Sequence, residues 1–303
     1  MAAGPAGAAD EIDNFVNVVS PPRRAAELLT EIIVAKGWYS GDDAAERASA
    51  WLNAFVRHLK RREARTRELG SFVRYAFNSA DDDFIQGSSF CEPGDDPAMV
   101  EAKRLRANTI PIAAHFDALS PTDFETLCGG VLRLFGVADP QVSRRSADGG
   151  IDFYGQAPFA QVLAHDKLPA GVEKDLRVWI VGQAKHYKSV KVTTKELREL
   201  VGSTELARSK VFAGNTDPLD AMMARICDPV FYMIITSGKF TADSRDLISK
   251  SGIIAIDQLQ LAQLLADNGI GDAAETLTKD QLLAWLAREP AVDVRVELAQ
   301  AHA

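Results

Sequence analysis

The stretch Ser146-Ala-Asp-Gly-Gly-Ile-Asp-Phe-Tyr154 decides the fold of this 303-residue chain. Asp148 and Asp152 flank a Gly-Gly pair, and glycines let the backbone turn sharply and approach other groups closely. A short apolar run follows the second aspartate. The stretch therefore predicts a turn that opens into a strand, with a carboxylate where the strand begins.

A second strand is predicted at Arg177–Lys185, where Val, Ile and Trp lead into Val181-Gly-Gln-Ala-Lys185. Because side chains alternate along a strand, Gln183 and Lys185 would point to the same side. With Asp152 on a neighbouring strand, they would present a carboxylate, an amide oxygen and an ammonium at one place. A cation beside a phosphodiester needs these groups, since the metal prefers hard oxygen ligands and the developing phosphorane charge needs a positive donor.

The order of these motifs resembles the catalytic core of the Mrr-like restriction endonucleases, the subgroup of the PD-(D/E)XK nucleases in which glutamine stands in the usual acidic place. The resemblance runs from Leu119 to Leu265 and includes Phe124-Glu125 on the preceding helix, then Ile234–Phe240 and Gly252–Asp257. It implies a restriction-endonuclease-like α/β core, in which helices flank a mixed central sheet. The alternation of strand and helix patterns agrees with that fold class.

The resemblance also implies an activity, namely hydrolysis of DNA with Mg²⁺, or Mn²⁺ as a substitute, in restriction or antiviral defence against foreign DNA. Asp152, Gln183 and Glu125 would hold the metal. Lys185 would offset the charge that accumulates as water attacks phosphorus. Asp148 matches the family's first acid, and we expect it to stabilise the turn or support the ligands instead of binding the metal directly. A carboxamide offers an oxygen but no charge, so Gln183 would hold Mg²⁺ less strongly than a glutamate.

Each of these residues also has a simpler structural explanation. Asp152 could cap a turn after two glycines, and Glu125 could stabilise the first turn of a helix. Gln183 and Lys185 could be ordinary polar residues at a strand end. The combined spacing favours the metal site.

Basic residues lie on both sides of the predicted site in the sequence. Four of them are candidates for contacts with DNA phosphates: Arg145, Lys188, Lys191 and Lys195. Glu196 and Glu199 interleave with the later ones, so an ordinary charged helix surface is equally open.

The composition is that of a globular protein without a membrane span or a secretory leader, so we expect a cytoplasmic protein. The net charge of −8 argues against a surface coated in basic residues, but a local cationic groove is compatible with it. Cys91, Cys128 and Cys227 are widely separated and lack metal-binding spacing. Buried reduced thiols are the expected state of all three.

Four segments are predicted: a flexible tail over 1–20, a helical N-terminal domain and linker over 21–110, the nuclease domain over 111–268, and a helical appendage over 269–303. The N-terminal helices lack the paired strands of a winged-helix module. A helix is predicted from about Ala44 toward Lys60, and a third helix continues through Phe72, Tyr75 and Ala76. A basic cluster lies where the two meet: Arg57, Lys60, Arg61, Arg62, Arg65 and Arg67. We expect a solvated surface or an interdomain contact there, with a DNA-binding face as the alternative.

Cutting both strands of DNA needs two active sites, so a homodimer or larger homo-oligomer is expected. A regulatory partner or ligand would bind through the N-terminal domain. The segment 155–176 departs from the compact hairpin typical of the family and is a lid, an oligomer contact or a decorated turn. Two other functions stay open, a nuclease for RNA or for single-stranded or structured DNA, and a noncatalytic sensor that binds nucleic acid with the same core.

Overall fold

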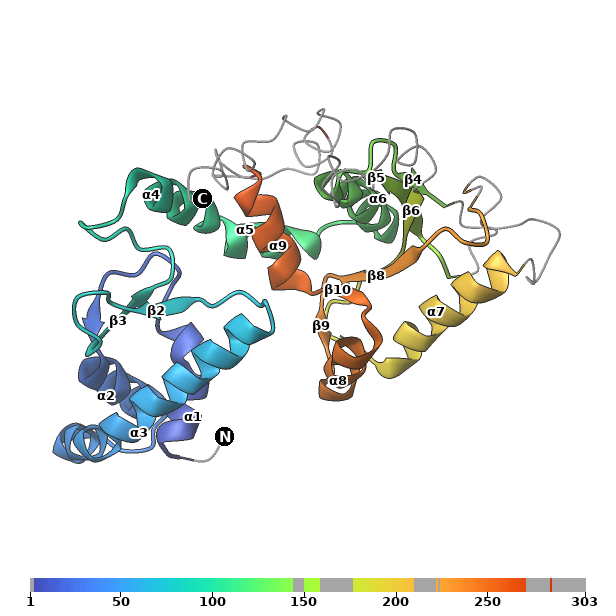
Figure 1. The fold of residues 1–303 in the computed structure, drawn as a ribbon. Coiled ribbons are helices and arrows are strands. Elements are labelled where there is room, and N and C mark those ends of the chain that lie inside the picture. Colours follow the sequence, from blue (N-terminus) through green and yellow to red (C-terminus); the bar gives the residue numbers. More distant parts are fainter. Residues whose placement is uncertain are drawn as a thin grey trace. The chain divides into compact units, whose positions relative to one another are not determined.

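The computed structural model describes residues 3–143, 150–158, 177–209, 222, 224–270 and 284 (Figure 1). These residues fall into two compact units. The first contains the chain up to residue 112 together with residues from Ala262, and the second contains residues 113–261. The predicted appendage over 269–303 lies almost entirely outside the described residues, as does most of the segment 155–176.

Helices of the first unit enclose a core of its own. They are α1 (Pro5–Asp10), the short η1 (Ile12–Asn14), α2 (Ala25–Ala35), α3 (Gly41–Glu68) and α4 (Pro97–Arg106). The apolar positions of α2 recur at helical spacing, and Leu29 and Ile33 are fully buried against Phe55 of α3. Ala8 and Ile12 are also fully buried in this cluster. This corrects the expectation of a flexible tail over 1–20. The segment is too short to show a helical period in the sequence, but packing against the core holds it in place.

Three short strands complete the first unit. They are β1 (Arg23–Arg24), β2 (Tyr75–Phe77) and β3 (Phe84–Gly87), which form an antiparallel sheet in the order β1-β3-β2. The prediction that paired strands are lacking was wrong. Gly70, in the left-handed region at φ 61°, follows the end of α3, and the Tyr75 hydroxyl donates to the Leu59 carbonyl at 2.8 Å. Tertiary packing thus makes a strand where the sequence predicted more helix.

The second unit is built on a five-stranded sheet in the order β10-β8-β6-β5-β4. Its strands are β4 (Gln141–Val142), β5 (Phe153–Pro158), β6 (Arg177–Lys185), β8 (Val230–Thr236) and β10 (Ile254–Ile256). The pairs β4–β5 and β5–β6 are antiparallel, whereas β6–β8 and β8–β10 are parallel. The predicted mixed sheet is confirmed. β7 (Lys191–Val192) and β9 (Lys239–Phe240) form a separate parallel pair.

Helices flank this sheet, as predicted. They are α5 (Thr109–Phe116), which enters the unit, α6 (Pro121–Val131) with the short η2 (Leu132–Phe135), α7 (Thr194–Arg208) and α8 (Ala242–Ser251). α9 (Gln258–Asp267) begins in this unit and ends in the first. In Figure 1, α6 lies beside β5 and β6, and α7 lies along the other side of β8. α6 begins with a capping box in which the Ser120 hydroxyl accepts from the Asp123 amide at 3.2 Å. No described helix combines the length and the apolar character needed to cross a membrane.

Two glycines let the elements around the centre of the sheet approach closely. A Cβ at Gly129 of α6 would lie 2.7 Å from Val142 Cγ2, which explains a glycine in the middle of a helix. A Cβ at Gly182 of β6 would lie 2.1 Å from the Phe153 ring. The first contact brings α6 against β4, and the second brings the start of β5 against β6, where the candidate site lies.

Candidate active site

Asp152 lies beside the end of β6, where it bonds the backbone of Gly182 and Ala184. Its amide donates to the Gly182 carbonyl at 3.0 Å, so the residue continues the β5–β6 pairing by one position. Its carboxylate Oδ2 accepts from the Ala184 amide at 2.7 Å. The backbone of β6 therefore orients the carboxylate, and the two predicted strands bring their polar residues together.

Gln183 is buried, with 2% of its surface exposed. Its Nε2 donates to the Gly150 carbonyl at 2.8 Å. Its Oε1 is buried, and no donor among the described residues reaches it. A buried acceptor without a partner costs about 1–3 kcal/mol, so such an atom calls for a specific explanation, such as a bound ion.

Gly150 shapes the turn that holds the Gln183 amide. Its φ of 87° lies in the left-handed region that side-chain-bearing residues rarely adopt. A Cβ there would lie 3.3 Å from Gln183 Nε2 and 3.4 Å from Ser203 Oγ of α7. Glu199 Oε1 would lie 3.8 Å away. The sequence analysis considered Glu199 only as an interruption of basic residues, and missed that α7 borders this turn.

Lys185 ends β6 with its side chain half-buried, and its charge acts on Glu196 of α7. Burial opposes ionisation of Glu196, but hydrogen bonds from Thr193 and the nearby Lys185 ammonium hold the pKa of this carboxyl below its usual value. Thr193 and Glu196 also form the capping box of α7. Thr-x-x-Glu is a readable signature, so sequence reasoning could have placed Glu196 at the start of this helix.

Glu125 approaches the same region from α6, which packs on β5 and β6. Cys128 lies one turn farther along the helix and is fully buried. Burial first, and then the charges of Asp152 and Glu125, raise the pKa of the Cys128 thiol well above its ordinary value. Both carboxylates therefore lie near one buried thiol. Cys91 and Cys227, expected to be buried, are exposed.

The other predicted site residues are placed less fully. Lys188, Lys191 and Lys195 are exposed on the segment that leads from β6 into α7. Asp148 and Arg145 lie outside the described residues. His186, beside Lys185, bonds the Phe116 carbonyl through Nε2 at 2.8 Å and packs on the Phe124 ring, so it anchors α5 and α6 to the end of β6.

The donors at this place fit a divalent cation. Asp152 offers a carboxylate oxygen, and Gln183 offers a buried amide oxygen without a donor among the described residues. Oxygen donors of this kind are the ligands that Mg²⁺ and Mn²⁺ prefer.

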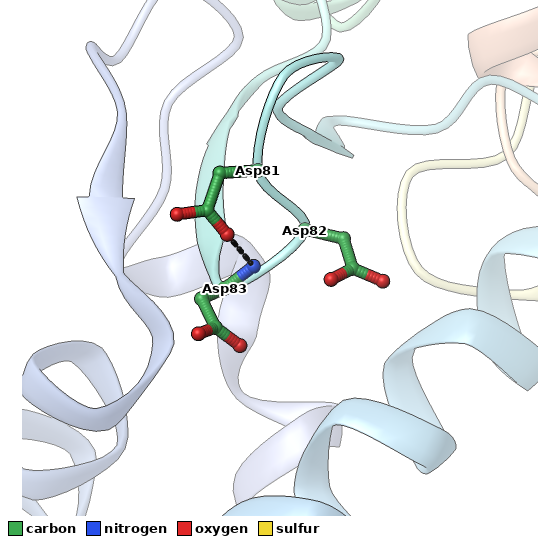
Figure 2. Close-up of side chains that lie close together, drawn as sticks. All are labelled: Asp81, Asp82 and Asp83. Atoms are coloured by element: carbon green, nitrogen blue, oxygen red, sulfur yellow. Dashed lines mark hydrogen bonds between the residues drawn. The ribbon is translucent and has the colours of Figure 1, made fainter.

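A second acidic group lies in the first unit, on the turn between β2 and β3 (Figure 2). Among the described residues, Asp81, Asp82 and Asp83 alone form a trio of acidic, histidine or cysteine side chains whose ligand atoms lie within 4.8 Å of one another. All three are exposed. Asp82 pairs with Lys60, and Asp81 accepts from the Asp83 amide at 3.0 Å. These contacts explain the group as part of a turn.

Comparison with known proteins places the candidate site in a recognised domain. Residues 116–214 match Mrr_cat, a restriction endonuclease family. This span contains the four predicted catalytic residues, Glu125, Asp152, Gln183 and Lys185. No curated protein matches the chain.

Similar solved structures include the MspJI restriction endonuclease in complex with a 27-mer oligonucleotide, at 18% identity over 70% of this chain and 43% of that one, with a TM-score of 0.37. Another is the DNA modification-dependent restriction endonuclease AspBHI, at 18% identity over 67% of this chain and 44% of that one, with a TM-score of 0.36. The chain thus spans less than half the length of either structure.

Proposed function

Since residues 116–214 carry an Mrr-type restriction endonuclease domain, we propose that this protein cleaves DNA phosphodiester bonds with a divalent cation, Mg²⁺ with Mn²⁺ as a substitute, in restriction or defence against foreign DNA. The observation that carries the proposal is Gln183. Its amide nitrogen is fixed by Gly150 and its buried oxygen has no donor among the described residues, beside the carboxylate of Asp152.

Asp152, Gln183 and Glu125 would hold the cation. Bound there, it would supply Lewis-acid stabilisation of the phosphate charge and lower the pKa of a water molecule. The protein contributes orientation: the Ala184 amide fixes the Asp152 carboxylate, and the Gly150 carbonyl fixes the Gln183 amide. Preset donors need little reorganisation when the reaction occurs, which is a large part of catalysis by such sites.

Lys185 would donate to an oxygen of the scissile phosphate and stabilise the charge that develops during attack by water. The Lys185 ammonium lies near the carboxylate of Glu196 and contributes to lowering the pKa of that carboxyl. The exposed Lys188, Lys191 and Lys195 would contact phosphates farther along the strand.

The proposal is tested by incubating the full chain with plasmid, linear and single-stranded DNA and with RNA, in Mg²⁺, Mn²⁺ or EDTA. We expect strand breaks in DNA that require the cation. Lys185→Ala should lower the cleavage rate by roughly 100-fold or more, since it removes one preset charge from the transition state. Binding of DNA in EDTA should change by only a few fold.

Lys250→Ala is the matched control, because Lys250 is exposed on α8 and pairs only with Asp246 among the described residues. It should cleave like the unaltered protein. If RNA is the only nucleic acid cleaved in the presence of the cation, then RNA and not DNA is the substrate. Binding without cleavage under every condition would identify a noncatalytic sensor and contradict the proposal.

A further inference from the structure

Helix α3 of the first unit has a buried side and a basic side. Ala44, Ala48, Phe55 and Leu59 are buried. The basic cluster divides into two groups. Three members have acidic partners: Lys60 with Asp82, Arg62 with Asp13, and Arg67 with Glu63. The other three, Arg57, Arg61 and Arg65, are exposed, and their guanidinium groups have no hydrogen-bond or ion-pair partner among the described residues.

Arg57, Arg61 and Arg65 form a row along the helix. Residues four positions apart lie on one face of a helix, about 6 Å apart along its axis. Like charges at this spacing destabilise a helix, so the row is unfavourable for the free protein unless an anion binds it. The cost is local, because the chain as a whole has a net charge of −8.

The face around the row suits a phosphate backbone. The neighbours of the row on the same face of α3 are small or polar. They include Ala50, Asn53 and Ala64, which are all exposed. Small neighbours let a backbone approach the guanidinium groups. From Asn53 to Arg65 this face has no exposed aromatic or large aliphatic side chain, which a protein-binding surface would have at its centre, and the exposed Leu69 follows the row only at the C-cap of α3. Glu46 and Glu68 bound the row at its two ends.

We propose that Arg57, Arg61 and Arg65 of α3 form a second DNA-contacting surface, outside the catalytic domain, that binds phosphates of duplex DNA. Arginine presents a planar fork of donors that matches two phosphate oxygens, and it stays charged at all relevant pH values. Contacts of this kind add affinity and orient the protein without reading sequence. The surface concerns binding and not hydrolysis, so it can be tested apart from the proposed cleavage.

The experiment measures binding of the full chain to a fluorescent duplex of arbitrary sequence in EDTA, at salt concentrations from about 50 to 200 mM. Each phosphate contact contributes about 0.9 to the slope of log affinity against log salt. Combined Arg57→Gln, Arg61→Gln and Arg65→Gln should therefore reduce the slope by about 2 to 3. Glutamine keeps a high helix propensity, so α3 should stay folded, which circular dichroism checks.

The matched control removes three exposed cations that have acidic partners, by combining Arg67→Gln, Arg104→Gln and Lys250→Gln. Its net charge changes equally, and its slope should fall by less than one. Equal losses in both variants would show that only net charge matters and would overturn the proposal. An unchanged slope in the Arg57, Arg61 and Arg65 variant would overturn it too and leave another partner for the row. Failure of cleavage with every cation would count against the catalytic proposal alone.

Discussion

Gln183 shows how a neutral amide can fit beside the carboxylate of Asp152. Its Nε2 donates to the Gly150 carbonyl, so this position needs a donor as well as an acceptor. A glutamate would turn a carboxylate oxygen toward that carbonyl oxygen, and two acceptors repel each other. The Gly150 carbonyl therefore favours glutamine at position 183. A neutral amide would hold a cation less strongly than a carboxylate would.

We predict that Gln183→Glu destabilises the protein in EDTA by about 1–3 kcal/mol, because a buried carboxylate and the Gly150 carbonyl would both lack donors. Mg²⁺ should reverse part of this loss, since a charged ligand binds the cation more tightly and binding stabilises the folded state. Denaturant unfolding with and without Mg²⁺ measures both effects.

Gln258→Glu is the control for this substitution, because Gln258 also donates to a main-chain carbonyl, that of Ala113 at 3.2 Å. It is half-buried and lies outside the candidate site, so its effect should not depend on Mg²⁺. If Gln183→Glu is as stable in EDTA as the unaltered protein, the role given to Gly150 is wrong.

At the scale of residues, the sequence predicts a site of Asp152, Gln183 and Lys185 but not the groups that orient the first two. The strand period brings Gln183 and Lys185 to one side and a turn brings Asp152 beside them. The partners that orient them are backbone groups, the Gly150 carbonyl and the Ala184 amide. Backbone groups carry no sequence signal, because every residue has them.

β6 is the element on which the site depends, and Gly182 sets its contact with β5. The Phe153 ring occupies the place where a side chain at Gly182 would lie, since a Cβ there would be 2.1 Å from Phe153 Cε2. The ring thus packs over β6 directly beside Gln183. Any enlargement at Gly182 must move the ring or separate the strands.

We predict that Gly182→Ala destabilises the protein by about 1–3 kcal/mol, the usual cost of overpacking a core. Cleavage should fall as well, because the shift displaces Asp152 from the Ala184 amide. Gly202→Ala on α7 is the matched control, since a Cβ there meets no atom within 4 Å. This change should stabilise the protein by about 0.4–1 kcal/mol. Thermal unfolding measures whether Gly182→Ala lowers and Gly202→Ala raises the stability. Changes of the same sign in both variants would contradict the packing of Phe153 on Gly182.

Elements were predictable where local signals and burial agree. Val230–Thr236 and Ala242–Ser251 carry a strand pattern and a helix pattern in the sequence, and β8 and α8 have these bounds because their apolar periods match the faces they bury. β2 was mistaken for helix, since Tyr75 follows a long charged helix at compatible spacing. Its strand conformation depends on β3, which pairs with it from farther along the chain. Pairing of that kind is nonlocal and leaves little trace in a short stretch.

For the whole molecule, the division into units could be foreseen only in part. The family match at 116–214 lies within the second unit, and the described residues of the first unit have a separate core that includes Ile12 and Phe55. The chain start was mistaken for a tail, because α1 has six residues and no capping side chain. Short helices of this kind are stable only through tertiary packing.

Each copy of the chain has one Asp152, Gln183 and Lys185 set, whereas a duplex has two strands to cut. One set can cut both strands only if the chain dissociates after the first cut, or reorients on the DNA, before the second cut. Two copies on one duplex can cut both strands in a single encounter. We therefore propose that double-strand cleavage requires a pair of chains, and that a single chain only nicks.

We predict that linearisation of a supercoiled plasmid rises more steeply than first order with protein concentration, whereas nicking stays close to first order. Mixing the unaltered protein with an excess of the Lys185→Ala variant should then yield nicked circles in place of linear product, because each mixed pair has one active site and cuts one strand. An excess of the Lys250→Ala variant should raise the amount of linear product instead, since its sites are intact and the concentration of active chains increases. Gel analysis of the three plasmid forms measures the ratio. If the inactive variant slows both products equally, it only competes for DNA, and each chain cuts the two strands by itself.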